Sequence, residues 1–234
     1  MGESSSTPGV PAVFLDRDGT LNEMVYDSTH GLMDSPRRPE QVVPMRFAGE
    51  LVHGLRELGY RIVVVTNQPG IAKGTLTQAE LDDVHVALAK AIQPGYWDAL
   101  EYCPHHPEHG AGAKCACRKP APGMLLKAAG EGGIDLSKSW MVGDGLVDVQ
   151  AGKAAGCRTI LLTKLKVNVV ERFFELDGAE PDFIAGNLRE VLKCISGGHE
   201  APQPYKAREY EGEGSIPSRS CPGSGAGSLS EGAE

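Results

Sequence analysis

Three apolar runs in this chain each reach a polar residue suited to chemistry, and helix-like segments lie between them. VPAVFL leads into Asp16, YRIVVVTN contains Thr66, and SWMVGD ends on Asp144. Strands that alternate with helices form a mostly parallel sheet covered on both faces, and ligands gather at the carboxyl ends of such strands. The pattern predicts an α/β, Rossmann-like three-layer sandwich in which these three residues share one site.

Helical spacing of apolar residues and local stop signals place the other elements. Helices are expected at residues 47–59, 77–91, 124–129, 146–155 and 187–195. The capping box TQAE marks the start of the second helix. Further strands, rich in β-branched and aromatic residues, are expected at residues 99–103, 157–162 and 181–184.

Composition divides the chain of 234 residues into three parts. We predict a flexible N-terminus at residues 1–9, one folded domain at residues 10–196, and a tail at residues 197–234. The tail is rich in Gly, Ser and Pro, so it cannot bury enough apolar surface to offset the entropy of ordering, and we expect it to be disordered.

Charge and hydropathy narrow the possible partners. The net charge of −8 argues against a nucleic-acid partner. No segment is long and apolar enough to cross a membrane, and the N-terminus lacks the basic and apolar regions of a secretory signal. We therefore expect a cytoplasmic protein without membrane contact. Because the sequence carries no obvious exposed apolar stripe, we expect a monomer.

The acidic motifs suit phosphoryl chemistry with a divalent cation. In FLDRDGT, Asp16 and Asp18 lie two residues apart, so their charges repel unless a cation or a shared proton compensates. Asp16 can attack phosphorus and Asp18 can transfer the proton, while Mg²⁺ prefers such oxygen ligands. In MVGDGLVD, Asp144 suits a Mg²⁺ ligand and Asp148 suits its support. Alone, each acid also fits a solvated turn or a helix start.

Two further motifs can neutralise a phosphate group. Thr66 and Asn67 follow a buried strand and can donate hydrogen bonds, although this position also suits a helix cap or a turn. In CRKP, Lys119 can stabilise developing negative charge and Arg118 can hold a phosphate with two donors. A solvated basic pair is the alternative interpretation of CRKP.

The segment CPHHPEHGAGAKCAC has the spacing of a structural zinc site. Cys103, His105, Cys115 and Cys117 give Cys-x-His and Cys-x-Cys pairs, which can close tetrahedrally around Zn²⁺. His106 and His109 compete for the histidine position, and His105 gives the symmetric spacing. The alternatives are free thiols in a loop or a nucleic-acid-binding zinc ribbon. The acidic chain argues against the ribbon.

Taken together and in this order, these motifs resemble motifs I to IV of the haloacid dehalogenase-like phosphohydrolases. The resemblance implies that Asp16 is the nucleophile and that Asp18 is the acid and base. It implies that Thr66 and Lys119 stabilise the phosphoryl group. It also implies Mg²⁺ as a cofactor, held by Asp16, Asp18 and Asp144.

The zinc loop narrows the resemblance to the D-glycero-D-manno-heptose-1,7-bisphosphate 7-phosphatase family. That family lacks a large cap domain, and the segments after the first two motifs are too short for one here. The resemblance implies a small phosphorylated sugar as substrate and Zn²⁺ as a structural ion beside Mg²⁺. Expected substrate-binding residues are Met24, Val25, Tyr26, Asp27, Asn67, Gln68 and Arg118.

Some positions depart from the family pattern. Gly145 replaces a basic residue that is common after the last acidic motif, and Pro69 and Lys73 replace frequent Ser and Arg. Loss of a cation at Gly145 weakens the case for a substrate with two phosphates. Arg37 and Arg38 are possible substitutes for it, and the sequence alone does not place them.

Two alternative functions stay open at this point. The related histidinol-phosphate phosphatases share the zinc loop, although a cationic substrate would favour acidic neighbours over Arg118. A zinc-stabilised binding domain without turnover is the non-enzymatic alternative. The intact catalytic positions argue against it.

Overall fold

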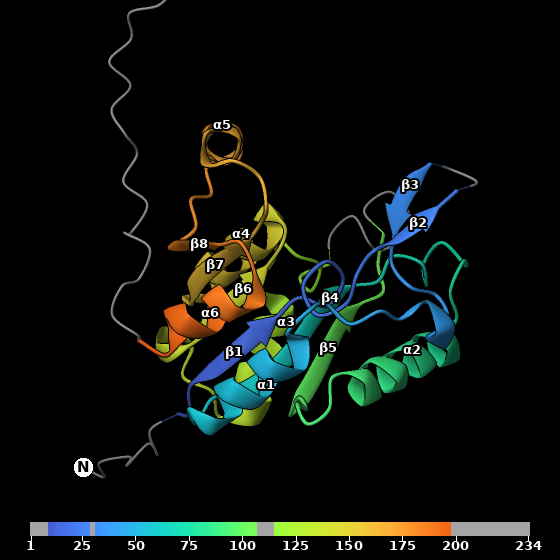
Figure 1. Cartoon of the computed structure of the whole chain (residues 1–234), viewed down its shortest axis with the longest axis horizontal. Coiled ribbons are helices and arrows are strands. Elements are labelled where there is room, and N and C mark those ends of the chain that lie inside the picture. Colours follow the sequence, from blue (N-terminus) through green and yellow to red (C-terminus); the bar gives the residue numbers. More distant parts are fainter. Residues whose placement is uncertain (1–8, 29–30, 107–114, 198–234) are drawn as a thin grey trace, which may run out of the picture.

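The computed structural model describes residues 9–28, 31–106 and 115–197. Its centre is a parallel sheet of six strands in the order β5-β4-β1-β6-β7-β8 (Figure 1). These strands are β1 (Ala12–Leu15), β4 (Arg61–Asn67), β5 (Ala99–Cys103), β6 (Trp140–Gly143), β7 (Arg158–Leu162) and β8 (Phe183–Ala185). Because β1 lies between β4 and β6, the residues at the carboxyl ends of these three strands meet.

Helices on both faces of the sheet give the predicted three layers. Helices α1 and α6 pack on one face, and α3 and α4 pack on the other. The α-helices are α1 (Ala48–Glu57), α2 (Gln78–Ala91), α3 (Gly123–Gly132), α4 (Leu146–Ala155), α5 (Val167–Asp177) and α6 (Leu188–Ile195), and two short 3-10 turns are η1 (Pro39–Gln41) and η3 (Leu136–Lys138). Within the described ranges, no helix has the length and apolarity that a membrane crossing would need.

The central strands alternate their side chains between two cores. In β1, Val13 and Leu15 join the core under α1 and α6, whereas Ala12 and Phe14 join the core under α3 and α4. All four are fully buried. This alternation follows from the two-residue period of a strand, and burial on both faces explains why β1 reads as a continuous apolar run. The two cores hold the ends of β1, β4 and β6 in fixed positions.

A hairpin of two short strands and helix α5 were not expected from the sequence. Strands β2 (Val25–Asp27) and β3 (Leu32–Asp34) pair in an antiparallel hairpin, which stands apart from the central sheet on the side of α2 (Figure 1). Three residues per strand are too few for a periodic signal. Helix α5 is the other addition. The insertion after β1 is this small hairpin, so the described chain has no large cap domain.

The chain ends lie mainly outside the description. Of the predicted flexible N-terminus and the predicted tail, only Gly9 and Gly197 are described. The described elements run from Ala12 to Ile195, inside the predicted folded domain. Flexibility of the first part and disorder of the last therefore stay predictions.

Candidate active site

The sheet brings three of the predicted site residues to one edge. Asp16 follows β1, Thr66 lies near the end of β4, and Asp144 follows β6. The Asp16 amide donates to the Val142 carbonyl at 2.9 Å, which fixes the end of β1 against β6. These residues lie close together because the carboxyl ends of parallel strands share one edge.

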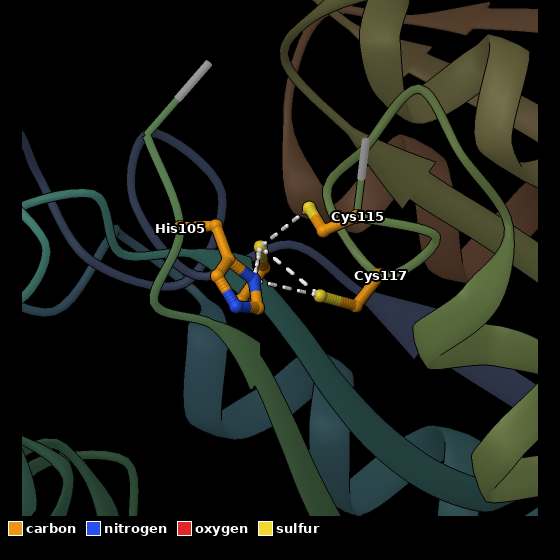
Figure 2. A group of neighbouring side chains, drawn as sticks. His105, Cys115 and Cys117 are labelled. Carbon is orange, nitrogen blue, oxygen red and sulfur yellow. Dashed lines mark hydrogen bonds between the residues drawn. The ribbon is translucent and has the colours of Figure 1, made fainter. Parts of the chain in front are cut away.

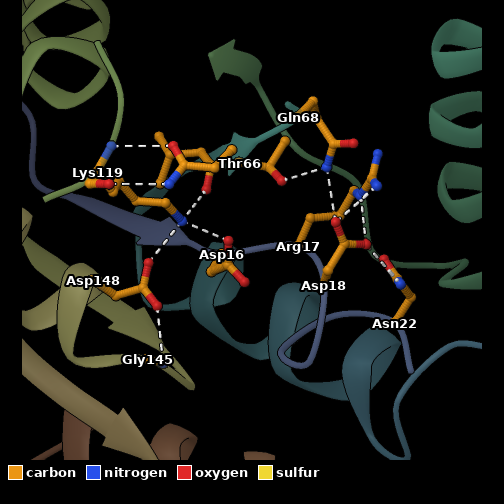
Figure 3. A network of polar contacts seen from close by, with 11 residues as sticks. Asp16, Arg17, Asp18, Asn22, Thr66, Gln68, Lys119, Gly145 and Asp148 are labelled. Carbon is orange, nitrogen blue, oxygen red and sulfur yellow. Dashed lines mark hydrogen bonds and ion pairs between the residues drawn. The ribbon is translucent and has the colours of Figure 1, made fainter. Parts of the chain in front are cut away.

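Lys119 is the centre of a buried charge network. Its Nζ lies 2.5 Å from Asp16 Oδ1 and 2.6 Å from Asp148 Oδ1, and it donates to the Val65 carbonyl at 2.9 Å. Figure 3 shows the ammonium group between the two carboxylates. With 3% of its surface exposed, Lys119 donates hydrogen bonds to Asp16 and Val65 and forms an ion pair with Asp148. The arrangement fixes one positive charge beside Asp16.

Asn67 holds the backbone of Lys119. The Asn67 side chain accepts from the Lys119 amide and donates to the Lys119 carbonyl, both at 3.1 Å. The two hydrogen bonds link the end of β4 to the CRKP segment, which is 52 residues away. In this arrangement Asn67 supports the position of Lys119, whereas its predicted contact with substrate stays a prediction.

Asp18 lies in a second network, pointing away from Lys119 (Figure 3). Arg17 binds it with two hydrogen bonds of 2.9 and 2.8 Å, and Asn22 donates to it at 3.0 Å. Gln68 Nε2 donates both to Asp18, at 2.8 Å, and to Thr66 Oγ1, at 2.8 Å. Gln68 therefore links Asp18, the predicted acid and base, to Thr66, whose hydroxyl is predicted to bind phosphate.

Burial and neighbouring charges shift the pKa values of Asp16, Asp18 and Lys119 in different ways. Burial raises the pKa of Asp16 to about 8, where the Lys119 charge opposes the rise and the charges of Asp148 and Asp18 add to it. Burial also disfavours the charged form of Asp18, but the Arg17 guanidinium and the hydrogen bonds outweigh it and hold the Asp18 pKa below its usual value. Burial disfavours charge on Lys119, but Asp148 and Asp16 raise the Lys119 pKa above its usual value, so it is a cation at working pH.

Three carboxylates form a group that suits a hard cation. Oxygen atoms of Asp16, Asp144 and Asp148 lie within 4.8 Å of one another. Asp144 is exposed at the mouth of the site, yet desolvation by the protein around it and repulsion from Asp148 raise the Asp144 pKa to about 6. Mutual repulsion of this kind is relieved by a bound cation, and carboxylate oxygens are the ligands that Mg²⁺ prefers. The donor set therefore fits Mg²⁺.

Asp18 lies outside this carboxylate group, because its oxygens accept from Arg17, Asn22 and Gln68. Its assignment as a Mg²⁺ ligand stays a prediction. Asp148 lies in the carboxylate group instead, and it accepts from the Gly145 amide at 3.0 Å. The sequence analysis named Asp148 only as a supporting residue.

The close approach of Asp144 to the loop after β1 explains why the first motif contains Gly19. Gly19 has a φ of +86°, and a Cβ atom there would lie 2.1 Å from Asp144 Oδ2. Glycine adopts this left-handed conformation without steric cost. Its missing side chain leaves room for the Asp144 carboxylate beside the β1 loop.

The predicted zinc ligands converge. Sγ of Cys103 lies 3.7 Å from Sγ of Cys115 and 3.3 Å from Sγ of Cys117, and His105 Nδ1 lies 3.3 Å from Cys117 Sγ (Figure 2). A tetrahedral zinc ion with Zn–S bonds of about 2.3 Å sets its sulfur ligands about 3.8 Å apart. The four donors therefore fit a zinc ion. His109 lies outside the described residues.

A cleft lies between the zinc-loop end and the β2–β3 hairpin. It has a volume of about 480 Å³, and its wall includes Asn67, Gln68 and Arg118. Arg118 Nη1 donates to the His105 carbonyl at 3.3 Å, which ties the arginine to the cysteine and histidine group. We name this space the Arg118 cleft. It borders Gln68, which binds Asp18.

The hairpin contributes to this cleft differently from the prediction. Asp27 lines it, whereas Met24, Val25 and Tyr26 are not part of its wall, and their contact with substrate stays a prediction. The sequence analysis left Arg37 unplaced and did not assign Lys73 to the site. Further lining residues are Leu32, Met33, Asp34, Ser35, Arg37, Pro69, Gly70, Lys73, Thr75 and Leu76. Some of these residues lie in or after the hairpin and the others follow β4, so only the folded arrangement brings them together.

Comparison with known proteins identifies relatives along most of the chain. A family model described as HAD-hydrolase-like matches residues 116–191. D-glycero-beta-D-manno-heptose-1,7-bisphosphate 7-phosphatase of Escherichia coli (strain K12) is 39% identical over 194 residues, which cover 80% of this chain and 94% of the relative. The protein of the same name from Yersinia pestis is 35% identical over 198 residues, which cover 81% and 97%.

Solved structures agree with this similarity. The structure of D,D-heptose 1,7-bisphosphate phosphatase from B. bronchiseptica, complexed with magnesium and phosphate, aligns with a TM-score of 0.65 and 29% identity. The alignment covers 80% of this chain and 98% of that structure. The corresponding phosphatase from Burkholderia thailandensis aligns with a TM-score of 0.56 and 27% identity, covering 80% and 99%.

Proposed function

Because this chain belongs to the heptose-1,7-bisphosphate 7-phosphatase family of haloacid dehalogenase-like hydrolases, we propose that it removes the 7-phosphate of D-glycero-β-D-manno-heptose 1,7-bisphosphate. The observation that carries this proposal is Lys119 Nζ at 2.5 Å from Asp16 Oδ1, at the edge where the three carboxylates meet. A fixed cation beside a nucleophilic carboxylate suits attack on a phosphate monoester.

The reaction proceeds in two displacements. An Asp16 oxygen attacks phosphorus, the bond from phosphorus to the sugar oxygen breaks, and Asp18 gives a proton to that oxygen. Water then attacks phosphorus, Asp18 takes the water proton, and the bond from phosphorus to Asp16 breaks. Lys119 supports both steps, because its charge stabilises the phosphoryl oxygens.

Asp18 needs a proton for the first displacement, although Arg17 favours its ionised form. The negative charge of an incoming phosphate repels the ionised form and raises the Asp18 pKa. Substrate binding therefore helps to protonate Asp18. Gln68 links Asp18 to Thr66, so the acid is held next to the hydroxyl that binds the phosphoryl group.

Asp16 and Asp144 would hold Mg²⁺, with Asp148 next to them. When bound, Mg²⁺ neutralises the phosphate oxygens and relieves repulsion among the carboxylates. Asp148 is anchored by Lys119 and by the Gly145 amide, so it also orients its neighbours. This role does not require a side chain at Gly145.

Mg²⁺ affinity should rise with pH. The pKa of Asp144 is raised to about 6 and that of Asp16 to about 8, so metal binding must displace protons from both carboxylates. We expect the apparent dissociation constant for Mg²⁺ to fall at least about tenfold between pH 5 and pH 7, since one displaced proton gives up to tenfold per pH unit. Calorimetry in buffers of different ionisation enthalpy measures the released protons. An apparent dissociation constant for Mg²⁺ that does not change with pH would contradict binding by these carboxylates.

The cysteine and histidine group would hold Zn²⁺ in a structural role. It lies beside Arg118, whose guanidinium donates to the His105 carbonyl, and Lys119 follows directly. Zinc would thus fix the segment that carries both cations. Four protein ligands would leave a bound zinc ion no open position for substrate, so it would take no part in bond breaking.

Loss of zinc should change substrate binding before it changes chemistry. We expect Cys117→Ser to lose the bound zinc and to raise the KM for the sugar bisphosphate at least about tenfold, because outer support of this kind contributes about 10–100-fold. Metal content and steady-state kinetics measure both effects. Cys194→Ser is the control, because Cys194 lies outside the cluster. An unchanged KM after zinc loss would refute the role.

The substrate test is phosphate release with Mg²⁺ from a panel of phosphate esters. The panel contains heptose 1,7-bisphosphate, the two heptose monophosphates, fructose 1,6-bisphosphate and histidinol phosphate. The proposal predicts the highest kcat/KM for heptose 1,7-bisphosphate. Preference for histidinol phosphate would move the chain to the related phosphatases, and no release from any ester would favour a binding domain.

A further inference from the structure

A second cleft borders one of the three carboxylates, Asp144. It has a volume of about 790 Å³ and shares no lining residue with the Arg118 cleft. Its wall includes Gly19 and Asp144, so it opens directly onto the predicted metal site. Its other walls come from the segment before α1, the end of β7 and the start of α6. The two clefts therefore have separate walls, and the second one reaches the carboxylate group through Asp144.

The charges of this second cleft are strongly unbalanced. Three cationic side chains line it, Arg46, Lys164 and Arg189, against the single carboxylate of Asp144. Arg189 pairs with Glu50 at 3.0 Å on the surface. Within the described part of the chain, Arg46 and Lys164 have no carboxylate partner within 4.0 Å. A cleft with unpaired cations attracts anions, because its walls focus their field.

Phe47 orients the two arginines without using their donors. The guanidinium carbon of Arg46 lies 4.6 Å from the centre of the Phe47 ring, and that of Arg189 lies 3.9 Å from it. Stacking of this kind holds the planar group and leaves its N–H edges available for oxygen ligands. Arg189 already uses its edge for Glu50, so among the residues that the structure describes Arg46 is the arginine of this pair whose edge has no partner.

The backbone at Phe47 is held in an uncommon conformation. Phe47 has a φ of 74°, and it is the one non-glycine residue with positive φ in the described ranges. Such a conformation is uncommon for a bulky side chain and persists where the surrounding structure holds it. Here it places the aromatic ring at the wall of the second cleft, between the chain that carries Arg46 and the start of α6.

We propose that Arg46 and Lys164 bind a phosphate monoester group that is not the one being hydrolysed. Phosphate suits this site because it matches the edge of a guanidinium and the point charge of a lysine. The cleft volume leaves room for the organic part of a phosphorylated molecule. The group is either the second phosphate of the substrate, which rests on the proposed function, or that of a separate phosphorylated molecule. Arg46 and Lys164 would supply cations in place of the side chain missing at Gly145.

The test uses the full chain with Mg²⁺ and the double variant Arg46→Ala/Lys164→Ala. The matched control is Lys90→Ala/Lys193→Ala, which removes two exposed cations outside both clefts. One measurement compares KM for heptose 1,7-bisphosphate with KM for p-nitrophenyl phosphate, which has a single phosphate. A second measures bound inorganic phosphate per chain by equilibrium dialysis, which requires no turnover and so does not depend on the proposed function.

If the substrate supplies the group, the double variant raises KM for the bisphosphate at least about tenfold and leaves KM for p-nitrophenyl phosphate unchanged, since a charge-assisted contact contributes at least that factor. If a separate molecule supplies it, both KM values stay constant and bound phosphate falls from two to one per chain. The proposal is overturned if KM is unchanged and the wild-type chain binds a single phosphate, or if the control variant shows the same changes.

Discussion

Replacement of Asp16 by asparagine is expected to lower the rate of phosphate release at least about 10,000-fold, because removing a nucleophile typically has an effect of this size. Asparagine keeps the shape but cannot attack phosphorus. Phosphate release with saturating Mg²⁺ measures the loss. The control is Asp83→Asn, an exposed carboxylate on α2, which should leave the rate unchanged. Residual activity within about tenfold of the wild type would remove Asp16 from the mechanism.

The same substitution should not destabilise the fold at pH 8. The folded-state pKa of Asp16 is raised from 3.8 to about 8, so the folded state binds a proton more tightly than the unfolded state. The stability from this difference is present below the unfolded pKa and is lost as pH rises through about 8. Asparagine carries no charge to desolvate, and Lys119 retains Asp148. A Tm equal to or above that of the wild type at pH 8 is expected, which separates loss of chemistry from loss of folding.

Replacement of Lys119 by methionine should reduce both turnover and stability. The side chain is buried and contacts Asp16 and Asp148, so its loss leaves two carboxylates without their cation. Removing one partner of a buried ion pair costs about 3–5 kcal/mol. Loss of a fixed charge at the reacting group should also lower kcat about 100–1,000-fold. Denaturant unfolding and steady-state kinetics measure the two effects.

The loss of stability in Lys119→Met should depend on pH. Asp16, whose pKa is raised to about 8, is protonated at pH 5 and then needs no cation, so the loss of stability should be smaller at pH 5 than at pH 8. Lys127→Met is the matched control, because Lys127 forms an exposed ion pair with Glu101 at 2.9 Å. Exposed pairs contribute about 0–1 kcal/mol. An equal loss at both pH values would show that packing, and not charge, explains the effect.

The arrangement of the predicted catalytic residues follows closely from the sequence. Asp16, Thr66 and Asp144 each stand at the end of an apolar run, and the parallel sheet brings such ends together. Cys103 and Cys117 are similarly predictable, because metal-ligand spacing is a local property of the chain. The confirmed fold therefore depends on patterns that extend over a few residues or one strand.

Other parts of the site depend on contacts that no local pattern records. The double hydrogen bond of Asn67 to Lys119 joins residues 52 positions apart. The cleft at Arg46 requires segments before α1 and after β7 to pack beside each other, and three-residue strands hide the hairpin that carries Asp27. These features arise from tertiary packing, so they were absent from the sequence-based prediction.

The most direct test of the proposed function is a ³¹P NMR time course with D-glycero-β-D-manno-heptose 1,7-bisphosphate and Mg²⁺. The account predicts that the signal of the phosphate on C7 disappears, that inorganic phosphate appears in equal amount, and that the C1 phosphate signal persists. Loss of the C1 phosphate, or two unchanged signals under conditions where the E. coli relative is active, would contradict it.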